Sequence, residues 1–532
     1  MHECLRRPAV LFKIFHLVFQ EPLLGPKTVA ALAATCQRFR NPALDILWWT
    51  LPALAPLVMC LPMDAWHLTD KRTMSLRRPT TLEDWARCRI YGRRIVRLGF
   101  CPQPRQQVYP RIDGTILNAL ALNRVLDFPI LQEFCGDLVP TWFMGMFLVP
   151  TLRSLELGIP SDDQKFIFVT LLDSLRTRCP DLQVLRLTCN RPPSRSACRC
   201  VDTSSVFPRL LADLKHLEVF YPAHTILPSG ALRILAASST LRVLLSDNDA
   251  EDFLPELPPE HPGFPRLQYL TIRTKELGKC SELLKRMDAG GLQGVRITLA
   301  CYPTALEFYA FFMVLAERCS AHVFSALCIV EDKRRLRSIE EPNLWDSDDH
   351  LITPDTIQPL LVLKNIQWFT ICVTCACDFN DASIEQMTGA WPKMRQFHLG
   401  SDVGWGVGLG VSMDTLITIA RAWSMLEALY VCVNADTTRS SVGRPGNGFC
   451  CETLVALYVG TSRLNMKAAE TAAFLTDLFP NLSGIFAIDN QQYWTEVQDL
   501  LYCMQVVRIQ ERAWIAGHEY GRDQPSSVTC DR

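Results

Sequence analysis

A short apolar pattern recurs along most of the chain. It places apolar residues at the first, fourth and sixth positions of a six-residue segment, as in LRSLEL from Leu152 and LQVLRL from Leu182. The copies begin at Leu152, Leu182, Leu214, Leu241, Leu267, Leu292, Phe324, Ile366, Met394, Leu426, Leu454 and Leu482, with a mean spacing of about 30 residues. A period of this length over so much of the chain predicts a stack of similar units.

The segments between the apolar copies have the pattern of helices. Residues 162–178 carry four apolar side chains at successive intervals of three, and segments 412–423 and 465–479 behave similarly. Each unit is therefore predicted to be strand, loop and helix. One such unit cannot bury its apolar side alone, whereas a stack can. The alternative is a doubly wound α/β domain with varied spacings and long insertions, and the one long spacing here contains the polar stretch 331–350.

Residues 1–50 follow a different pattern, that of three short helices. Pro8 opens the first helix, which carries Leu11, Ile14 and Phe15. Three short helices bury little apolar surface by themselves, so a partner or the next domain must cover the remainder. The alternative is that the segment is a helical cap on the stack, because terminal caps are common in repeat arrays.

The repeated pattern resembles the leucine-rich repeat family, whose LxxLxL spacing is present in most units. Several predicted helices end in a cysteine shortly before the next strand, as at Cys179 and Cys319. This is similar to the cysteine-containing subclass that is common in F-box proteins. The resemblance implies an α/β leucine-rich-repeat solenoid of about twelve strand-loop-helix units, preceded by a small all-α domain.

The N-terminal segment resembles the F-box, which has a proline before its first helix, a cysteine and an aromatic residue in its middle, and a leucine and a tryptophan at its end. The matching residues are Pro8, Leu11, Ile14, Phe15, Cys36, Phe39, Leu44 and Trp48. The resemblance implies that these residues bind a Skp adaptor, and through it a cullin, in a ubiquitin ligase whose protein substrate is held by the repeats. The region after residue 50 is similar to the linker of fungal F-box proteins.

One departure from the family leaves an alternative open. The acidic residue that usually follows the opening proline is absent, and Ala9 and Val10 take its place. The chain could therefore be a non-catalytic interaction scaffold with a degenerate F-box and no ligase role. Under either interpretation we expect no enzyme activity of its own.

These patterns predict four regions in the chain. Residues 1–50 are expected to form the F-box-like three-helix domain, and residues 51–150 a helical linker and N-terminal cap of the solenoid. Residues 151–490 are expected to hold the irregular repeats, and residues 491–532 a C-terminal cap and tail.

The position between the second and third apolar residues of each copy projects from the inner face of a leucine-rich repeat. Reading this position along the chain gives Glu156, Arg186, Glu218, Leu245, Thr271, Arg296, Cys328, Thr370, His398, Tyr430, Tyr458 and Phe486. The last four are expected to be exposed rings in one line, which suits a substrate-binding surface because rings bury much area with little loss of rotamer entropy. The alternative is that the segment Trp494–Trp514 folds over these rings as a cap.

Charge and hydropathy exclude several classes of partner. The chain has 532 residues and a net charge of −1, but residues 1–111 carry 17 Lys and Arg against 7 Asp and Glu. This distribution leaves no chain-wide basic footprint, so we expect no nucleic-acid partner. The chain has no apolar run of roughly 18 residues and no recognisable signal peptide, so we expect a cytoplasmic or nuclear protein without membrane contact.

Candidate chemistry is sparse. Cys372, Cys375 and Cys377 are closely spaced, as are Cys198 and Cys200, but the two groups lie about six repeats apart, too far to share a zinc ion. The patterns HExxH and GxSxG and the Cys–His signature are absent from the sequence. We therefore expect no catalytic residue, no metal site and no cofactor.

Overall fold

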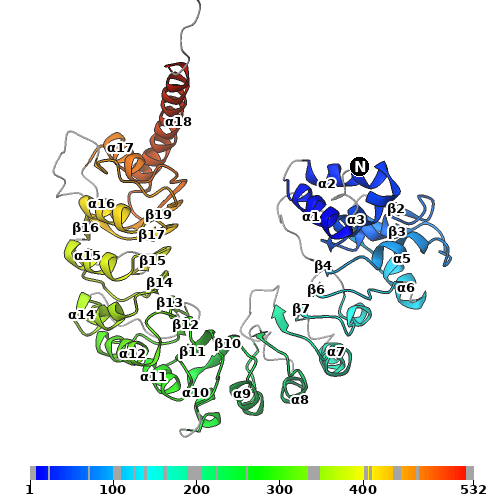
Figure 1. The fold of residues 1–532 in the computed structure, drawn as a ribbon. Coiled ribbons are helices and arrows are strands. Elements are labelled where there is room, and N and C mark those ends of the chain that lie inside the picture. The colour runs from blue at the N-terminus through cyan, green and yellow to red at the C-terminus, as the bar shows by residue number, and fades with distance from the viewer. Residues whose placement is uncertain are drawn as a thin grey trace, which may run out of the picture. The chain divides into compact units, whose positions relative to one another are not determined.

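The structure is a computed structural model. It describes residues 7–21, 24–69, 72–99, 109–123, 126–136, 140–159, 165–188, 205–222, 225–258, 262–332, 348–400, 405, 410–434, 445–462 and 466–522. The chain divides into two compact units, residues 1–247 (unit 1) and residues 248–532 (unit 2), and each is considered by itself below. Both units belong to the α/β class, with parallel strands joined by helices (Figure 1).

Unit 1 begins with three short helices that share a small core. They are α1 (Pro8–Phe19), α2 (Gly25–Thr35) and α3 (Gln37–Leu47). Leu11, Phe15, Val29, Ala43 and Ile46 are buried together between them. Gly25 allows the tight turn into α2, because a Cβ atom there would lie 2.5 Å from the carbonyl oxygen of Phe19.

A parallel sheet forms the rest of unit 1. Its strands, in spatial order, are β1 (Thr50–Leu51), β4 (Arg97–Leu98), β6 (Glu133–Cys135), β7 (Ser154–Gly158), β8 (Val184–Thr188), β9 (Val219–Tyr221) and β10 (Val243–Asp249). Neighbouring strands align Leu51, Leu98, Phe134, Leu155, Leu185, Phe220 and Leu244 in one buried row. The segment 51–150, expected to be a helical linker and cap, thus also supplies strands to the sheet that the repeats continue.

Helices and a small side sheet complete unit 1. The helices are α4 (Ala55–Val58), α5 (Ala86–Gly92), α6 (Gly114–Asn123), the 3-10 helix η3 (Thr141–Phe147), α7 (Lys165–Arg178), α8 (Val206–Asp213) and α9 (Ser229–Ala236). The side sheet contains β2 (Trp66–Leu68), β3 (Thr73–Leu76) and β5 (Arg111–Ile112).

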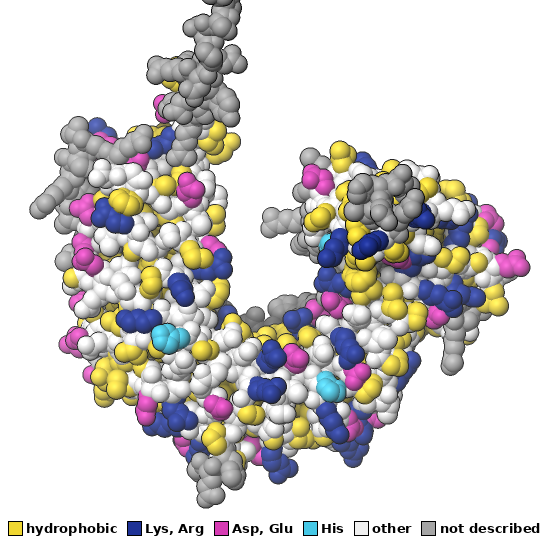
Figure 2. Space-filling view, in the orientation of Figure 1, with side chains coloured by type: hydrophobic (Ala, Val, Ile, Leu, Met, Phe, Trp, Pro, Cys, Tyr) yellow, Lys and Arg dark blue, Asp and Glu magenta, His cyan; other side chains and the backbone are white. Residues whose placement is uncertain are grey.

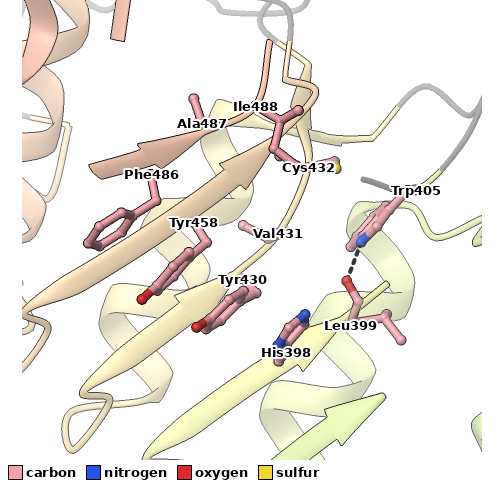
Figure 3. A pocket seen from close by; sticks show the side chains of 11 residues that line it. His398, Leu399, Trp405, Tyr430, Val431, Cys432, Tyr458, Phe486, Ala487 and Ile488 are labelled. Atoms are coloured by element: carbon pink, nitrogen blue, oxygen red, sulfur yellow. Dashed lines mark hydrogen bonds between the residues drawn. The ribbon is translucent and has the colours of Figure 1, made fainter. Parts of the chain in front are cut away.

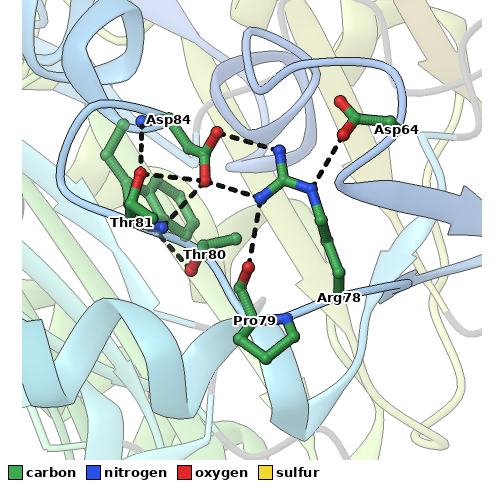
Figure 4. Close-up of polar contacts among 7 residues, drawn as sticks. Asp64, Arg78, Pro79, Thr80, Thr81 and Asp84 are labelled. Carbon is green, nitrogen blue, oxygen red and sulfur yellow. Dashed lines mark hydrogen bonds and ion pairs between the residues drawn. The ribbon is translucent and has the colours of Figure 1, made fainter.

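A guanidinium cluster holds the loop that leads into α5. Arg78 donates to Asp84 through both terminal nitrogens, at 2.8 and 3.0 Å, and its Nε donates to Asp64 at 2.8 Å (Figure 4). The indole N–H of the buried Trp85 donates to the Thr80 hydroxyl at 3.0 Å. These hydrogen bonds order the loop between β3 and α5, and the Arg78 guanidinium holds the pKa of Asp84 below its usual range.

Unit 2 is a second run of parallel strands. In spatial order they are β11 (Tyr269–Thr274), β12 (Gly294–Leu299), β13 (Ala326–Glu331), β14 (Trp368–Cys372), β15 (Gln396–Leu399), β17 (Ala428–Tyr430), β19 (Ala456–Gly460) and β20 (Gly484–Ala487), and β16 (Val411–Ser412) pairs separately with β18 (Val433–Asn434). The core row runs along Leu270, Val295, Leu327, Phe369, Phe397, Leu429 and Leu457, all buried.

The helices of unit 2 alternate with its strands. They are α10 (Ala250–Phe253), η5 (Leu254–Glu256), α11 (Leu277–Lys285), α12 (Ala305–Arg318), η6 (Asp348–His350), α14 (Pro354–Ile357), η7 (Gln358–Val362), α15 (Asp381–Ala390), α16 (Met413–Ala422), α17 (Ala468–Leu478) and α18 (Gln491–Arg522). Helices α11 to α16 lie along one side of the strand row (Figure 1). The opposite side of these strands is called the strand face below.

The alternation of strand and helix confirms the predicted leucine-rich-repeat solenoid, with one correction of register. Val219 pairs with Val184 and Phe220 with Leu185, so the third copy begins at Leu217 and the prediction of Leu214 is wrong. Leu214 instead follows α8 and bonds back to Leu210 as that helix ends. The position between the second and third apolar residues of this copy is therefore held by Tyr221, which pairs with Arg186, and not by Glu218.

Candidate protein-binding face

The strand register of unit 2 brings the four predicted ring side chains into one row. His398 pairs with Tyr430, Tyr430 with Tyr458, and Tyr458 with Phe486. Neighbouring strands lie about 4.8 Å apart, so side chains at equal register are in contact along the sheet. These four residues are called the aromatic row.

The rings of the aromatic row are stacked. Ring centroids are 3.8 Å apart between His398 and Tyr430, 3.7 Å between Tyr430 and Tyr458, and 4.4 Å between Tyr458 and Phe486. The interplanar angles are 5°, 5° and 16°, so the rings are nearly parallel (Figure 3). Each ring therefore limits the rotamers of the next, and the row is a preformed surface.

Small residues on the same strands leave room for the rings. Two positions before the rings stand Ala428, Ala456 and Gly484, paired across β17, β19 and β20. At Gly484 a Cβ atom would lie 2.9 Å from Cε2 of Phe486, so the Phe486 ring lies directly over that glycine. A larger residue at position 484 would displace the last ring of the row.

Exposure changes along the row. The Phe486 side chain is 49% exposed, whereas that of His398 is 6% exposed. The expectation that all four rings are exposed is therefore wrong for His398, because the Tyr430 ring stacks on it. The accessible part of the row is its C-terminal end.

A cavity of about 290 Å³ adjoins the aromatic row. It is lined by His398, Leu399, Trp405, Tyr430, Val431, Cys432, Tyr458, Gly460, Phe486, Ala487 and Ile488. Trp405 stands across the cavity from the rings, and its indole N–H donates to the carbonyl oxygen of Leu399 at 2.6 Å (Figure 3). The described residues that line the cavity include no Asp, Glu, Lys or Arg, so the cavity suits an uncharged group.

Seven of the eleven lining residues were not predicted as site residues, among them Ile488 and Trp405. Ile488 lies two positions after Phe486, and the alternation of side chains along a strand could have placed both on one face. Trp405 belongs to a glycine-rich segment whose path no pattern predicts. The neighbouring Gly404, Gly406 and Gly408 lie outside the described residues.

The long C-terminal helix α18 closes the end of the sheet. Gln498 accepts the backbone N–H of Ile485 at 2.6 Å and donates to the carbonyl oxygen of Ser483 at 3.1 Å. Trp494 and Leu501 are buried on the same side of the helix. The cavity is lined by no described residue of α18, so the alternative in which Trp494–Trp514 folds over the rings does not hold for the described residues.

The eight residues that match the F-box are divided between core and surface. Leu11 and Phe15 are buried inside the three-helix core, and the Phe39 ring packs edge-on against Phe15 at 5.3 Å. Pro8 and Ile14 are exposed. The two groups therefore have different tasks, one holding the helices together and one facing outward.

The remaining matched residues, Cys36, Leu44 and Trp48, are half-buried. The Trp48 ring stacks on Tyr91 of α5 at 4.5 Å and 6°. Arg94 forms an ion pair with Asp45 of α3. These contacts join the three helices to the segment that follows them in unit 1.

Basic side chains that follow α5 form ion pairs within unit 1. Arg93 pairs with Asp127 at 3.1 Å, and Arg97 pairs with Glu133 at 2.7 Å. Over the visible surface of unit 2, basic and acidic side chains are interspersed (Figure 2).

Cys375 and Cys377, in the loop after β14, are buried thiols, whereas Cys372 in β14 is half-buried. Burial raises the pKa of Cys375 to about 12 and that of Cys377 well above its usual range. Within the part of the chain that the structure describes, there is no group of three or more His, Cys, Asp or Glu side chains that could hold a metal ion. Cys198 and Cys200 lie outside the described residues.

Comparisons with known proteins show only distant similarity. The chain matches no protein-family model and no curated protein sequence. The Rad7–Elc1 complex of yeast contains a chain that is 12% identical with a TM-score of 0.35, and the match covers 70% of this chain and 84% of that one. The plant peptide hormone receptor RGFR1, solved with RGF2, is 13% identical with a TM-score of 0.27, and the match covers 67% of this chain and 62% of that one. The described helices include none that is long and apolar enough to cross a membrane.

Proposed function

We propose that the chain is the substrate-recognition subunit of a Skp–cullin–F-box type ubiquitin ligase. In this proposal the three N-terminal helices bind a Skp adaptor, and the aromatic row binds a protein substrate. This proposal rests on two features that occur in one chain. The first is a three-helix segment with its own core and exposed apolar side chains. The second is a repeat solenoid with a preformed row of stacked rings.

The exposed apolar side chains of the three helices support an adaptor contact. The side chain of Ile14 is 37% exposed and that of Leu17 is 68% exposed, both on α1, and Leu24 is exposed immediately before α2. Clustered exposed apolar residues on a small helical unit are typical of protein–protein contacts. Leu11 and Phe15 support such a contact indirectly, because they fix the helices that carry these residues.

The proposed role requires no chemistry from this chain. A receptor of this kind raises the effective concentration of substrate lysines near the ligase, and it does so by holding two partners at once. The half-exposed Phe486 and its stacked neighbours supply the sort of rigid aromatic surface that anchors protein partners.

The alternative is an interaction scaffold whose F-box is degenerate and which has no ligase role. Two observations favour it: Ala9 and Val10 stand where an acidic residue is usual, and the Trp48 ring is already stacked on Tyr91. The two functions differ in one measurable property, the binding of a Skp adaptor.

Co-purification of the full chain with a purified Skp adaptor tests the proposal. We expect the wild-type chain to retain the adaptor, and the double variant Ile14→Ser, Leu17→Ser to lose it without unfolding, because both residues lie on the surface. Leu122→Ser, at an exposed leucine of α6, is the matched control and should retain the adaptor. Failure of the wild-type chain to bind would end the ligase proposal and leave the scaffold.

A further inference from the structure

The cavity beside the aromatic row has properties that define the group it could accept. Its volume of about 290 Å³ lies just below the range for ligand sites, which is roughly 300–1,000 Å³. A cavity of this size takes one large side chain and is too small for most cofactors. An occupant would contact the rings on one side and Trp405 on the other, with Ile488 at the rim.

The lining of the cavity also restricts the charge of the occupant. With no Asp, Glu, Lys or Arg among the described lining residues, an ammonium, guanidinium or carboxylate group would lose part of its hydration without gaining a charged partner. An aromatic ring has no charge whose hydration could be lost. Contacts between rings stabilise a complex by about 0.5–1.5 kcal/mol beyond the effect of the apolar area they bury.

We infer that this cavity is an anchor pocket for one aromatic side chain, Phe, Tyr or Trp, presented by a segment of the protein partner. The inference deepens the proposed substrate-binding role and shares with it only the premise that the strand face binds protein. The occupant contacts Tyr458 and Phe486 on one wall and Ile488 on the rim.

The geometry favours a side chain presented by a protein over a free small molecule. The cavity opens beside Phe486 and Ile488, whose side chains are 49% and 40% exposed, so its rim is an apolar surface on which the backbone next to an anchor residue could rest. In protein interfaces, most of the binding energy comes from a few aromatic side chains that are buried in pockets and surrounded by such a rim.

A displayed library of random ten-residue peptides, selected on the immobilised full chain, tests the inference. We expect the selected peptides to share an aromatic residue at one position. Replacing that residue with Ala in a synthetic peptide should weaken binding by roughly 30-fold or more, the lower bound for hot-spot truncations. This measurement uses unaltered protein, so it does not depend on the folding of a variant.

A charge placed on the rim provides the second arm. Ile488→Glu should weaken binding of the selected peptides by roughly 10-fold or more, because an uncompensated carboxylate then faces an apolar occupant. Met425→Glu is the matched control, since Met425 is 46% exposed against 40% for Ile488 and does not line the cavity. The control should bind as wild type.

Three results would overturn the inference: no binding peptide, selected peptides that depend on a charged residue in place of an aromatic one, or equal binding by the Ile488→Glu and Met425→Glu variants. None of these depends on the adaptor experiment, which reports on α1. Adaptor binding without selection of aromatic peptides would support the ligase proposal and contradict the anchor pocket. Selection of aromatic peptides without adaptor binding would support the anchor pocket and contradict the ligase proposal.

Discussion

In the three-helix segment of unit 1, the side chains that match the F-box are divided between a core and a surface, whereas on the strand face of unit 2 the four predicted rings all lie in one row. Leu11 and Phe15 are buried among the helices, and Ile14 points outward. His398 to Phe486 are spaced by the strands themselves and stack in order.

The difference comes from the kind of pattern used for each prediction. The residues of a family motif include those that the fold needs as well as those that bind a partner. In a small helical unit, most of them are needed for packing. Strand register selects positions by direction alone, because residues at equal register in parallel strands point the same way. The first pattern identifies a fold and the second identifies a surface.

The largest effect that would test this comparison is expected at Phe15. Phe15→Ala removes a ring from the core of the three helices and should destabilise them by about 3–5 kcal/mol. Ile14→Ser, one residue away and exposed, should change stability by no more than about 0.5 kcal/mol. Hydrogen exchange followed by mass spectrometry over residues 8–47 measures both, since exchange reports local opening. Equal protection in the two variants would contradict the division into core and surface.

A smaller effect on stability, with a larger one on binding, is expected at the aromatic row. Tyr430→Ser with Tyr458→Ser removes every stacked ring pair of the row, each contributing about 0.5–1.5 kcal/mol. We expect a modest fall in melting temperature and a loss of binding to aromatic peptides selected on the wild-type chain, measured by fluorescence anisotropy.

The control for the row is Phe449→Ser, which removes an exposed ring of unit 2 that does not line the cavity. It should leave peptide binding unchanged. If the double variant melts earlier than wild type yet binds the peptides equally well, the row is a structural feature of the sheet and not a docking surface.

Much of the repeat architecture could be predicted from the sequence because buried apolar positions and strand register share one period. The row from Thr271 to Phe486 follows the predicted positions. The third copy failed because Leu214 and Leu217 both fit the pattern, and only the end of α8 decides between them. The strand β1 was missed because two residues are too few to show a period.

The candidate site was predictable only in part, for a similar reason. Ring positions follow from register, but the depth of the cavity depends on Trp405, whose place is fixed by its hydrogen bond to the backbone of Leu399. The burial of His398 depends on the Tyr430 ring stacking against it at 3.8 Å. Such contacts have no signature in residue spacing. The predicted region boundaries at residues 50, 150 and 490 stay predictions.

The smallest effect is expected in the loop held by Arg78 in unit 1. The hydrogen bond from Arg78 lowers the pKa of Asp84 in the folded chain below the ordinary value of 3.8. A carboxyl group with a lowered folded-state pKa adds stability above its unfolded pKa, and that stability is lost as the pH falls through the folded value. Asp84→Asn should therefore lower the melting temperature at pH 7 and at pH 5, and the difference from wild type should shrink below pH 3.8.

Thermal melts from pH 7 to pH 3 measure this difference, with Glu83→Gln as the control because it removes a neighbouring exposed carboxylate that accepts no side-chain hydrogen bond from Arg78. The control should match wild type at every pH. Asp64→Asn, which removes the more exposed of the two carboxylates on Arg78, should have a smaller effect than Asp84→Asn. An offset for Asp84→Asn that is the same at pH 3 and pH 7 would mean that the loop is held by the shape of the Asp84 side chain and not by its charge.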